Sequence, residues 1–180
     1  MTAPLRVLFV CTANICRSPT MELLARDLVA GAAVEVASAG THAREGQPMN
    51  PEMAATLAPG PASGVARFHS RHLTPDLLGA ADLVLTAEDV HRRHVLDDFP
   101  ALHRKVFTLG QFAATIEDLP GLSGAELVRE AGQRRARAVP EHDVPDPYRR
   151  GTAAAEAATG TISAMLSAIV PRLTGAPQES

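Results

Sequence analysis

Several residue types are scarce in this 180-residue chain, and each scarcity excludes a class of protein. The two cysteines, Cys11 and Cys16, lie in one loop, so they cannot join distant parts of a disulfide scaffold. The N-terminus lacks a basic segment followed by a long apolar one, and no uninterrupted apolar run approaches membrane-spanning length. A net charge of −3 gives no general reason to expect nucleic acid as a partner. We therefore expect a cytoplasmic globular protein without a membrane span.

Lysine is nearly absent too, which bears on phosphate and cofactor binding. Lys105 is the only lysine, and the nucleotide-binding pattern Gly-x4-Gly-Lys-Ser/Thr occurs nowhere. A metal site at Cys11 and Cys16 is unfavourable, because the cation would lie against Arg17 and no further ligand pair is evident. We expect no metal and no organic cofactor, so any anion site must be built from local groups.

Short apolar segments alternate with amphipathic segments along the chain. We expect strands at 5–10, 34–40, 81–86 and 105–109, and helices at 18–29, 52–58, 75–78, 88–96, 121–139 and 152–173. This alternation predicts an α/β fold in which helices cover both faces of a doubly wound, four-stranded parallel sheet. The three layers would form one domain over residues 1–174 with the first strand internal, and 175–180 would be a disordered tail.

The loop after the first strand combines groups that suit attack on phosphorus. Cys11 and Arg17 bracket five residues, and Ser18 and Pro19 are suited to start a helix as N-cap and first helical residue. So short a loop can direct backbone N–H groups inward as an anion nest, to which Arg17 adds a bidentate donor. The same positive surroundings favour a thiolate at Cys11. A buried structural thiol is the better interpretation of Cys11 alone, but Arg17 and Ser18 favour a nucleophile.

A second group must supply a proton to the departing oxygen. Asp146 is the best candidate, because it lies between two prolines that stiffen the loop. Asp143, three residues earlier, is a rival that spacing does not eliminate. Tyr148, the only tyrosine, can form a wall for a planar substrate group.

Residues 10–19, Val-Cys-Thr-Ala-Asn-Ile-Cys-Arg-Ser-Pro, together with Asp-Pro-Tyr at 146–148, resemble the low-molecular-weight protein tyrosine phosphatases. The likeness covers most of the chain and includes Ser-Ala-Gly-Thr at 38–41 and His-Ser-Arg at 69–71. The Cys-x5-Arg pattern alone occurs in several unrelated phosphatase folds. The additional positions in the loop and the distant Asp-Pro-Tyr make the match specific.

The resemblance implies a role for each matching residue. Cys11 would form a phosphocysteine, Arg17 would bind the phosphate, and Asp146 would act first as general acid and then as general base. Ser18 would donate a hydrogen bond to the Cys11 thiolate. The implied phosphate-binding loop is Thr12, Ala13, Asn14, Ile15, Cys16, Arg17 and Ser18, supported by Asn14, Ser18, Ser38 and His69. For His69, a surface histidine without this role is an equally good interpretation.

The resemblance also implies a regulatory property and a partner. Cys16 matches a second cysteine that can form a reversible disulfide with the nucleophile. The expected substrate is a phosphotyrosine-containing protein, with a bacterial tyrosine kinase as one such partner.

The chain departs from the family pattern near the site, at Ala13, in the short loop at 41–45, which lacks a tryptophan found in the family, and at Arg149 and Arg150. Ala13 stands where the family usually has glycine, so a positive φ there would strain the loop, whereas Asn14 tolerates such angles better. Arg149 and Arg150 replace a second aromatic residue, from which we infer a preference for acidic residues flanking the phosphorylated one.

Two other functions compete with a phosphatase. An arsenate reductase on the same fold needs further cysteines or a partner thiol to carry electrons, and only Cys16 is available in this chain. A non-catalytic phosphate-binding module would be expected to lack the nucleophile or the acid, and candidates for both are present.

Overall fold

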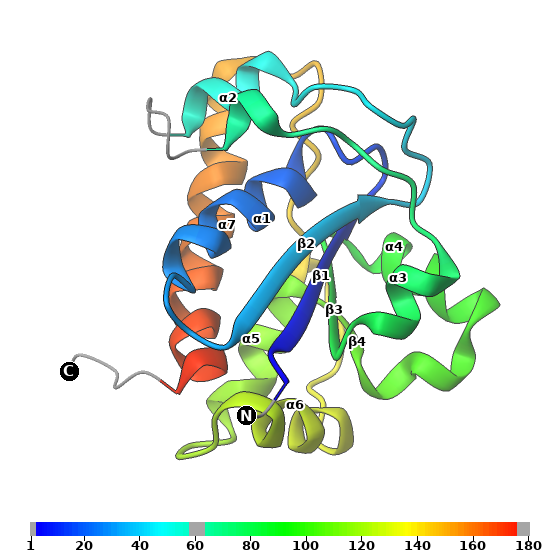
Figure 1. The fold of residues 1–180 in the computed structure, drawn as a ribbon, viewed down its shortest axis with the longest axis vertical. Helices are drawn as coiled ribbons and strands as arrows, with labels where there is room; N and C mark the ends of the chain where they lie inside the picture. The colour runs from blue at the N-terminus through cyan, green and yellow to red at the C-terminus, as the bar shows by residue number, and fades with distance from the viewer. Residues whose placement is uncertain (1–2, 58–63, 176–180) are drawn as a thin grey trace.

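The residues that the structure describes fold around one four-stranded parallel sheet. The computed structural model describes residues 3–57 and 64–175, shown in Figure 1. The strand order is β2-β1-β3-β4, with β1 Leu5–Cys11, β2 Val34–Gly40, β3 Leu83–Thr86 and β4 Val106–Thr108. Every pairing is parallel and β1 is internal, which confirms the predicted sheet.

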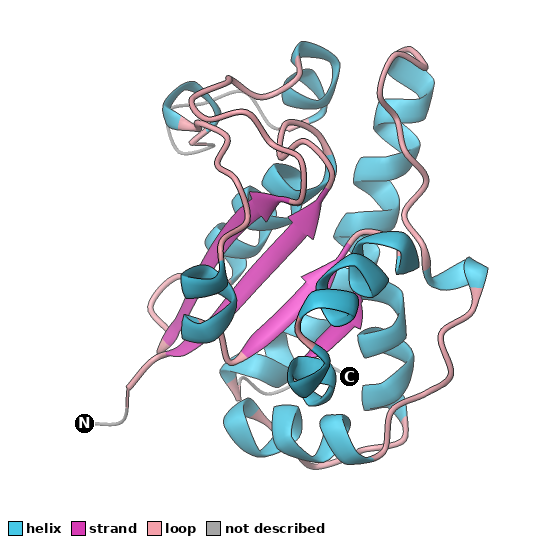
Figure 2. Ribbon diagram, turned by 90° about the vertical axis from the view of Figure 1, so that its right-hand side faces the viewer, coloured by secondary structure: helices cyan, strands magenta, loops and turns pink. Residues whose placement is uncertain are grey.

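Helices cover both faces of this sheet, as Figure 2 shows. One face carries α1 (Arg17–Leu28), α2 (Pro51–Thr56), α5 (Leu109–Glu117), α6 (Gly124–Gln133) and α7 (Thr152–Thr174); the other carries α3 (Pro75–Ala80) and α4 (Asp89–Asp98). Short 3-10 helices lie in the connections at Val65–Arg67, Pro100–Arg104 and Pro140–His142. Successive side chains of β1 enter opposite cores, Phe9 the larger and Val10 the smaller, because strand side chains alternate. The predicted three-layer architecture is confirmed.

The strand order creates a ligand-binding position at the carboxyl ends of β1 and β3. From β1 the chain crosses to β2 on one side, and it later returns to β3 on the other side. Val10 pairs with Thr86, so the loops after these two strands begin next to each other. Open α/β sheets bind ligands at such a divergence.

The long final helix is a core element. By length and composition α7 could cross a membrane, contrary to our expectation that no such segment exists. It packs against α1, α2, α5 and α6 and buries Ile162, Leu166 and Ile169 against them. Pro171 lies within this helix, and Gly175 ends it with φ 72°. Residues 176–180 of the expected tail lie outside the described residues.

The start of α1 differs from the prediction. Arg17 is its first residue and Cys16 its N-cap, so Ser18 is not the N-cap. Ser18 lies in the first turn of α1, and its hydroxyl lies 3.0 Å from Cys11 Sγ instead of capping the helix. The C-cap of α1 is Val29, the last residue of the expected helix.

Two further helix predictions were wrong in part. The fourth strand ends at Thr108, whose hydroxyl accepts a hydrogen bond from Gln111 N and caps α5, a helix that we did not predict. The helix expected at 121–139 is α6 and ends at Gln133, so the arginines after it do not form a helix face. Arg135 instead lies over the ring of Phe107, 4.2 Å from its centroid. The helix expected at 52–58 spans Pro51–Thr56, and its predicted proline-glycine stop at 59–61 lies outside the described residues.

Candidate active site

Cys11 is the last residue of β1 and pairs with Gly40 at the end of β2. The loop from Thr12 to Cys16 then passes close over Gly40. A Cβ at position 40 would lie 2.6 Å from the Thr12 carbonyl oxygen and 2.8 Å from the Asn14 nitrogen. Glycine is therefore required for the end of β2 to support this loop.

Asn14 gives the loop its shape. Its φ is 53° and its side chain is fully buried. Nδ2 donates to the hydroxyls of Ser18 and Ser38, at 2.8 Å each, and Oδ1 accepts from the backbone N–H of Arg71 at 2.9 Å. Ala13 is not among the residues with positive φ. The strain considered for Ala13 therefore does not arise, because the left-handed conformation falls on Asn14.

The hydrogen bonds of Asn14 continue in two directions. The Ser38 hydroxyl donates to the buried carboxylate of Glu22 at 2.5 Å, and Arg26 also pairs with that carboxylate. On the other side, Ser18 Oγ accepts from Asn14 and lies 3.0 Å from Cys11 Sγ and 3.3 Å from the Ala39 carbonyl oxygen. The single Ser18 proton therefore goes either to the Ala39 carbonyl oxygen or to a thiolate at Cys11.

His69 does not belong to this network. It is exposed, and its Nδ1 lies 3.1 Å from the Arg67 carbonyl oxygen. The neighbouring Arg71 reaches the loop instead, through its backbone N–H to Asn14 and its Nε to the Ser38 carbonyl. The proposed supporting role therefore passes from His69 to Arg71, whose backbone turns inward.

Arg17 is 2 % exposed and is fixed by groups from distant parts of the chain. One terminal nitrogen donates to Glu88 Oε2 at 2.5 Å and to the Val144 carbonyl at 3.0 Å, and the other lies 3.4 Å from Asp146 Oδ1. Its buried Nε has no hydrogen-bond partner among the described residues. The described residues also provide no acceptor for the backbone N–H groups of residues 12–16. The loop thus holds unused donors of the kind that bind an oxyanion.

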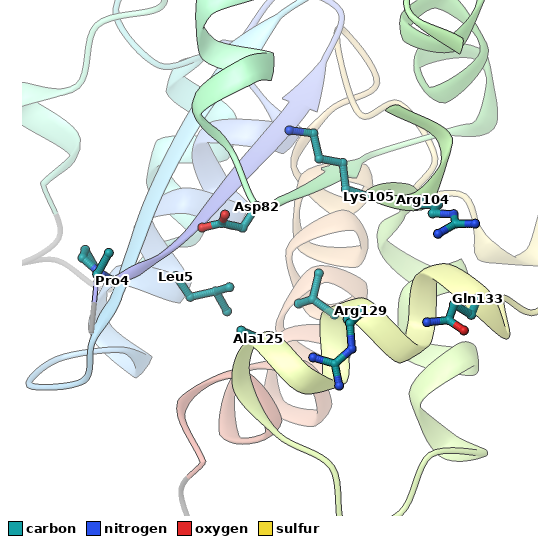
Figure 3. Close-up of a pocket in the computed structure, with 10 residues that line it drawn as sticks. Pro4, Leu5, Asp82, Arg104, Lys105, Ala125, Arg129 and Gln133 are labelled. Atoms are coloured by element: carbon teal, nitrogen blue, oxygen red, sulfur yellow. The ribbon is translucent and has the colours of Figure 1, made fainter. Parts of the chain in front are cut away.

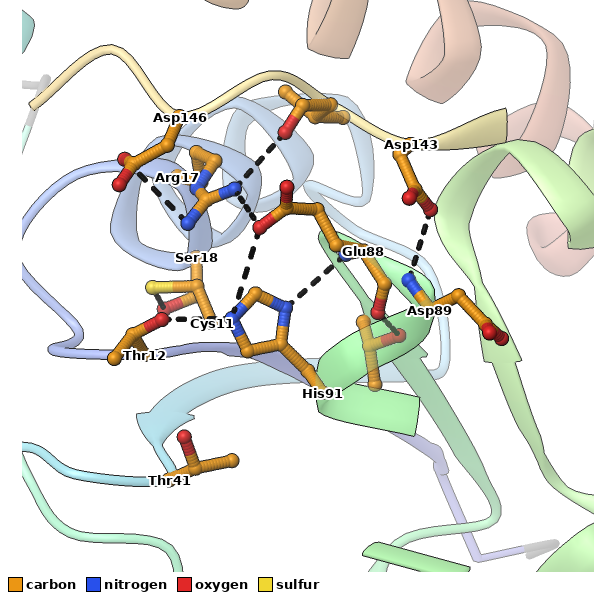
Figure 4. A network of polar contacts seen from close by, with 12 residues as sticks. Cys11, Thr12, Arg17, Ser18, Thr41, Glu88, Asp89, His91, Asp143 and Asp146 are labelled. Carbon is orange, nitrogen blue, oxygen red and sulfur yellow. Dashed lines mark hydrogen bonds and ion pairs between the residues drawn. The ribbon is translucent and has the colours of Figure 1, made fainter. Parts of the chain in front are cut away.

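Glu88 and His91 are parts of the site that sequence reasoning missed. Figure 4 shows Glu88 between Arg17 and His91, with His91 next to Thr12. Glu88 follows β3, the strand beside β1, and this position was the available signal: polar residues after neighbouring parallel strands meet at one edge of the sheet.

The two candidate acids occupy different places. Asp146 is 53 % exposed in its side chain and lines the same cleft as Cys11 and Arg17. Asp143 Oδ1 accepts the backbone N–H of Asp89 at 2.8 Å, at the start of α4, and does not line the cleft. Burial raises the pKa of Asp143. The geometry therefore places Asp146, and not Asp143, in the cleft that Cys11 lines.

The cleft that contains Cys11 has a volume of about 530 Å³. Besides the loop residues, its wall includes Gln47, Asp146 and Tyr148, and its basic residues are Arg17, His42, Arg44 and Arg149. Tyr148 is 43 % exposed, and the guanidinium of Arg149 lies 5.1 Å from the centre of its ring. Positive charge therefore exceeds negative charge around the opening.

The two thiols of this loop differ in character. Both are buried and neither is in a disulfide. Burial, followed by the nearby Cys11 and Asp146, raises the pKa of Cys16 to about 12. Cys16 is thus a neutral thiol at any ordinary pH, which leaves Cys11 as the candidate nucleophile.

A second cavity, of about 410 Å³, lies at the opposite end of the sheet, as Figure 3 shows. Two of its charged groups have structural partners: Asp82 accepts the backbone N–H of Arg6, and Lys105 donates to the carbonyls of Leu78 and Ala81. Neither cysteine lines it. In the described part of the chain, no group of three or more histidine, cysteine or acidic residues could hold a metal ion.

Known proteins share this sequence and this fold. The family model for low molecular weight phosphotyrosine protein phosphatase matches residues 6–120. A probable low molecular weight protein-tyrosine-phosphatase, EpsP, from Ralstonia nicotianae is 29 % identical over 167 residues, which cover 93 % of this chain and 94 % of that protein. A protein-arginine-phosphatase from Bacillus subtilis is 35 % identical over 109 residues, covering 59 % of this chain and 71 % of the relative.

Solved structures agree with the sequence matches. The low molecular weight protein tyrosine phosphatase from T. tengcongensis superposes with a TM-score of 0.73 at 28 % identity, over 94 % of this chain and 99 % of that one. The YwlE arginine phosphatase from Geobacillus stearothermophilus gives 0.71 at 28 % identity, over 96 % and 94 %. The family model alone spans more than half of the chain, so this protein is a phosphatase that belongs to the low molecular weight phosphotyrosine protein phosphatase family.

Proposed function

We propose that this phosphatase hydrolyses phosphotyrosine in proteins, with Cys11 as nucleophile, Arg17 as phosphate-binding residue and Asp146 as general acid and base. One observation carries the proposal: Cys11 and Arg17, from the two ends of one short loop, line the same cleft as Asp146, which comes from a distant segment, and the buried Nε of Arg17 has no hydrogen-bond partner among the described residues. A nucleophile, an oxyanion site and a proton donor are what hydrolysis of a phosphate monoester needs.

In the first step, the Cys11 thiolate attacks phosphorus and forms an S–P bond as the bond from phosphorus to the phenolic oxygen breaks. Asp146, protonated, gives its proton to that oxygen, and the free phenol leaves. Arg17 and the loop N–H groups stabilise the charge on the three equatorial oxygens. Ser18 donates to the sulfur and keeps the thiolate in place before attack.

In the second step, the Asp146 carboxylate removes a proton from a water molecule that attacks phosphorus. The S–P bond breaks, inorganic phosphate is released and the Cys11 thiolate is restored. The chemistry uses only groups of this chain and water.

The charge of the cleft favours an aryl ester over phosphoarginine. A guanidinium leaving group would approach Arg17, Arg44 and Arg149, with Asp146 as the one acidic residue of the cleft wall. Like charges that face each other in one cleft oppose binding, whereas a neutral aromatic ring can lie against Tyr148.

A panel of substrates tests this proposal. Without added metal, we expect a tyrosine-phosphorylated peptide to be hydrolysed with a kcat/KM at least about tenfold above that of the same peptide with phosphoarginine, since one unfavourable charge contact of ~1.4 kcal/mol has that effect. Release of inorganic phosphate measures both. Faster hydrolysis of the phosphoarginine peptide would contradict the assignment.

The same panel separates the competing functions. A parallel assay with arsenate and a thiol reductant detects reduction coupled to a partner thiol, and turnover there without hydrolysis of any phosphate ester would favour a reductase. Tight binding of phosphate with no turnover in any arm would favour a non-catalytic module.

The basic rim of the cleft leads to a prediction about the peptide. Arg149 and Arg150 are exposed and form no ion pair with any described residue. We expect wild type to prefer a peptide with acidic residues beside the phosphotyrosine, and Arg149→Ala with Arg150→Ala to reduce that preference about threefold to tenfold. The ratio of kcat/KM for acidic and neutral peptides measures it. Arg129→Ala with Arg134→Ala, at the other end of the sheet, removes the same charge and is the control; an equal effect of both pairs would refute specific recognition.

The partner and the compartment also belong to this proposal. A phosphotyrosine-containing protein such as a bacterial tyrosine kinase fits the site, and several relatives are named tyrosine phosphatases. We propose a cytoplasmic location, because the mechanism needs Cys11 as a free thiol and reducing compartments maintain free thiols.

A further inference from the structure

His91, in the first turn of α4, is a buried residue of the site with no role in the mechanism above. It is 3 % exposed, and its Nε2 lies 2.8 Å from the hydroxyl oxygen of Thr12. Thr12 directly follows Cys11 and lines the same cleft. A buried histidine from α4 therefore contacts the first residue of the loop that follows Cys11.

The hydrogen bonds of His91 determine its tautomer. The backbone N–H of Glu88 donates to Nδ1 at 3.2 Å, so Nδ1 is an acceptor and carries no proton. Burial, and then the positive charge of Arg17, lower the pKa of His91 to about 4, so the ring is neutral near neutral pH. The single ring proton is therefore on Nε2. Glu88 Oε2 lies 4.0 Å from Nε2, beyond hydrogen-bond distance, which leaves Thr12 as its acceptor.

This tautomer determines what the Thr12 hydroxyl can do. A hydroxyl has one proton and two acceptor lone pairs, and Nε2–H occupies a lone pair. No described residue accepts the Thr12 proton, and Thr12 is exposed to the cleft. The hydroxyl is therefore free to donate toward a ligand.

We propose that Thr12 donates its hydroxyl to a phosphoryl oxygen of the substrate and that His91 is a positioning residue that holds this hydroxyl in the donor orientation. This inference rests on the proposed function, because it places the phosphoryl group in the Cys11 cleft. It adds a side-chain contact to the backbone donors of the loop.

The first test measures binding of inorganic phosphate by titration calorimetry, which does not depend on turnover. Thr12→Val keeps the shape of the side chain and removes the hydroxyl, and it should weaken phosphate binding about 10- to 100-fold, as expected for a hydrogen bond to a charged group. Thr12→Ser keeps the hydroxyl and should bind within about threefold of wild type. Equal phosphate affinity of Thr12→Val and wild type would overturn the proposal.

The second test separates positioning from a purely structural role of His91. His91→Phe removes the donor to Thr12 and should weaken phosphate binding severalfold in wild type, with no further loss in a Thr12→Val background. A structural role predicts the same loss in both backgrounds, and that result would overturn the positioning role. Absence of aryl phosphatase activity in wild type that binds phosphate normally would refute the proposed function instead.

Discussion

Replacement of Cys11 by serine is expected to lower kcat/KM for an aryl phosphate by about 10⁴-fold or more. A serine hydroxyl is not ionised near neutral pH, and its nearest neighbour, the Ser18 hydroxyl 3.0 Å from the present Sγ, is no base. The loop shape should persist, because Asn14 and Ser38 hold it through bonds that do not involve Cys11. Steady-state kinetics with phosphate binding as a folding control measures the change. An active Cys11→Ser protein would refute the mechanism.

Cys16→Ser is the matched control for that variant. Cys16 lies in the same loop and is equally buried, yet its raised pKa keeps it a neutral thiol. We expect a much smaller loss of activity than for Cys11→Ser. Acid quenching during turnover followed by mass spectrometry should place the phosphoryl group on Cys11, and a label on Cys16 would contradict the assignment.

Asp146→Asn is expected to lower kcat about 10²- to 10⁴-fold for a phosphotyrosine peptide, the range typical of a missing general acid. An amide cannot supply the proton that the phenolic oxygen needs. The loss should shrink for esters whose leaving group is stable as an anion, so the dependence of log kcat on leaving-group basicity should become steeper. A uniform loss across a series of substituted phenyl phosphates would refute proton donation.

Asp143→Asn provides the comparison for this second prediction. It removes the same charge three residues away, but its carboxylate accepts the backbone N–H of Asp89. We expect it to cost stability, about 0.5–1.5 kcal/mol, and to leave the leaving-group dependence as in wild type. Thermal unfolding and the same series of esters measure the two effects. A steeper dependence for Asp143→Asn would identify Asp143 as the acid.

The fold was predictable because local and long-range signals agree in the strands. Residues 5–10 and 34–40 are short, apolar and followed by turns, and β1 and β2 have nearly these bounds. α5 was missed because Gly110 resembles a stop after the fourth strand. Glycine at position 110 is required by a tertiary contact instead: a Cβ there would lie 2.6 Å from the His142 carbonyl oxygen. A contact with residue 142 has no trace in the local pattern.

The site was predictable where one short segment contains it and less so where distant segments meet. The loop from Cys11 to Ser18 was found because all its groups are consecutive. Glu88 and His91 reach it from the loop after β3, and Arg71 reaches it through a backbone N–H. Backbone donors have no residue-type signature, which is why His69, a more conspicuous side chain, was chosen in place of Arg71.

Cys11 and Asp146, the proposed nucleophile and acid, lie on parts of the fold that we expect to differ in rigidity. Cys11 ends β1, an internal strand hydrogen-bonded on both sides, whereas Asp146 lies on a largely exposed loop. Amide hydrogens of β1 should therefore exchange with solvent only when the whole domain opens, and those around Asp146 should exchange through local openings. We therefore expect the loop after Cys11 to keep its shape while the segment around Asp146 opens locally.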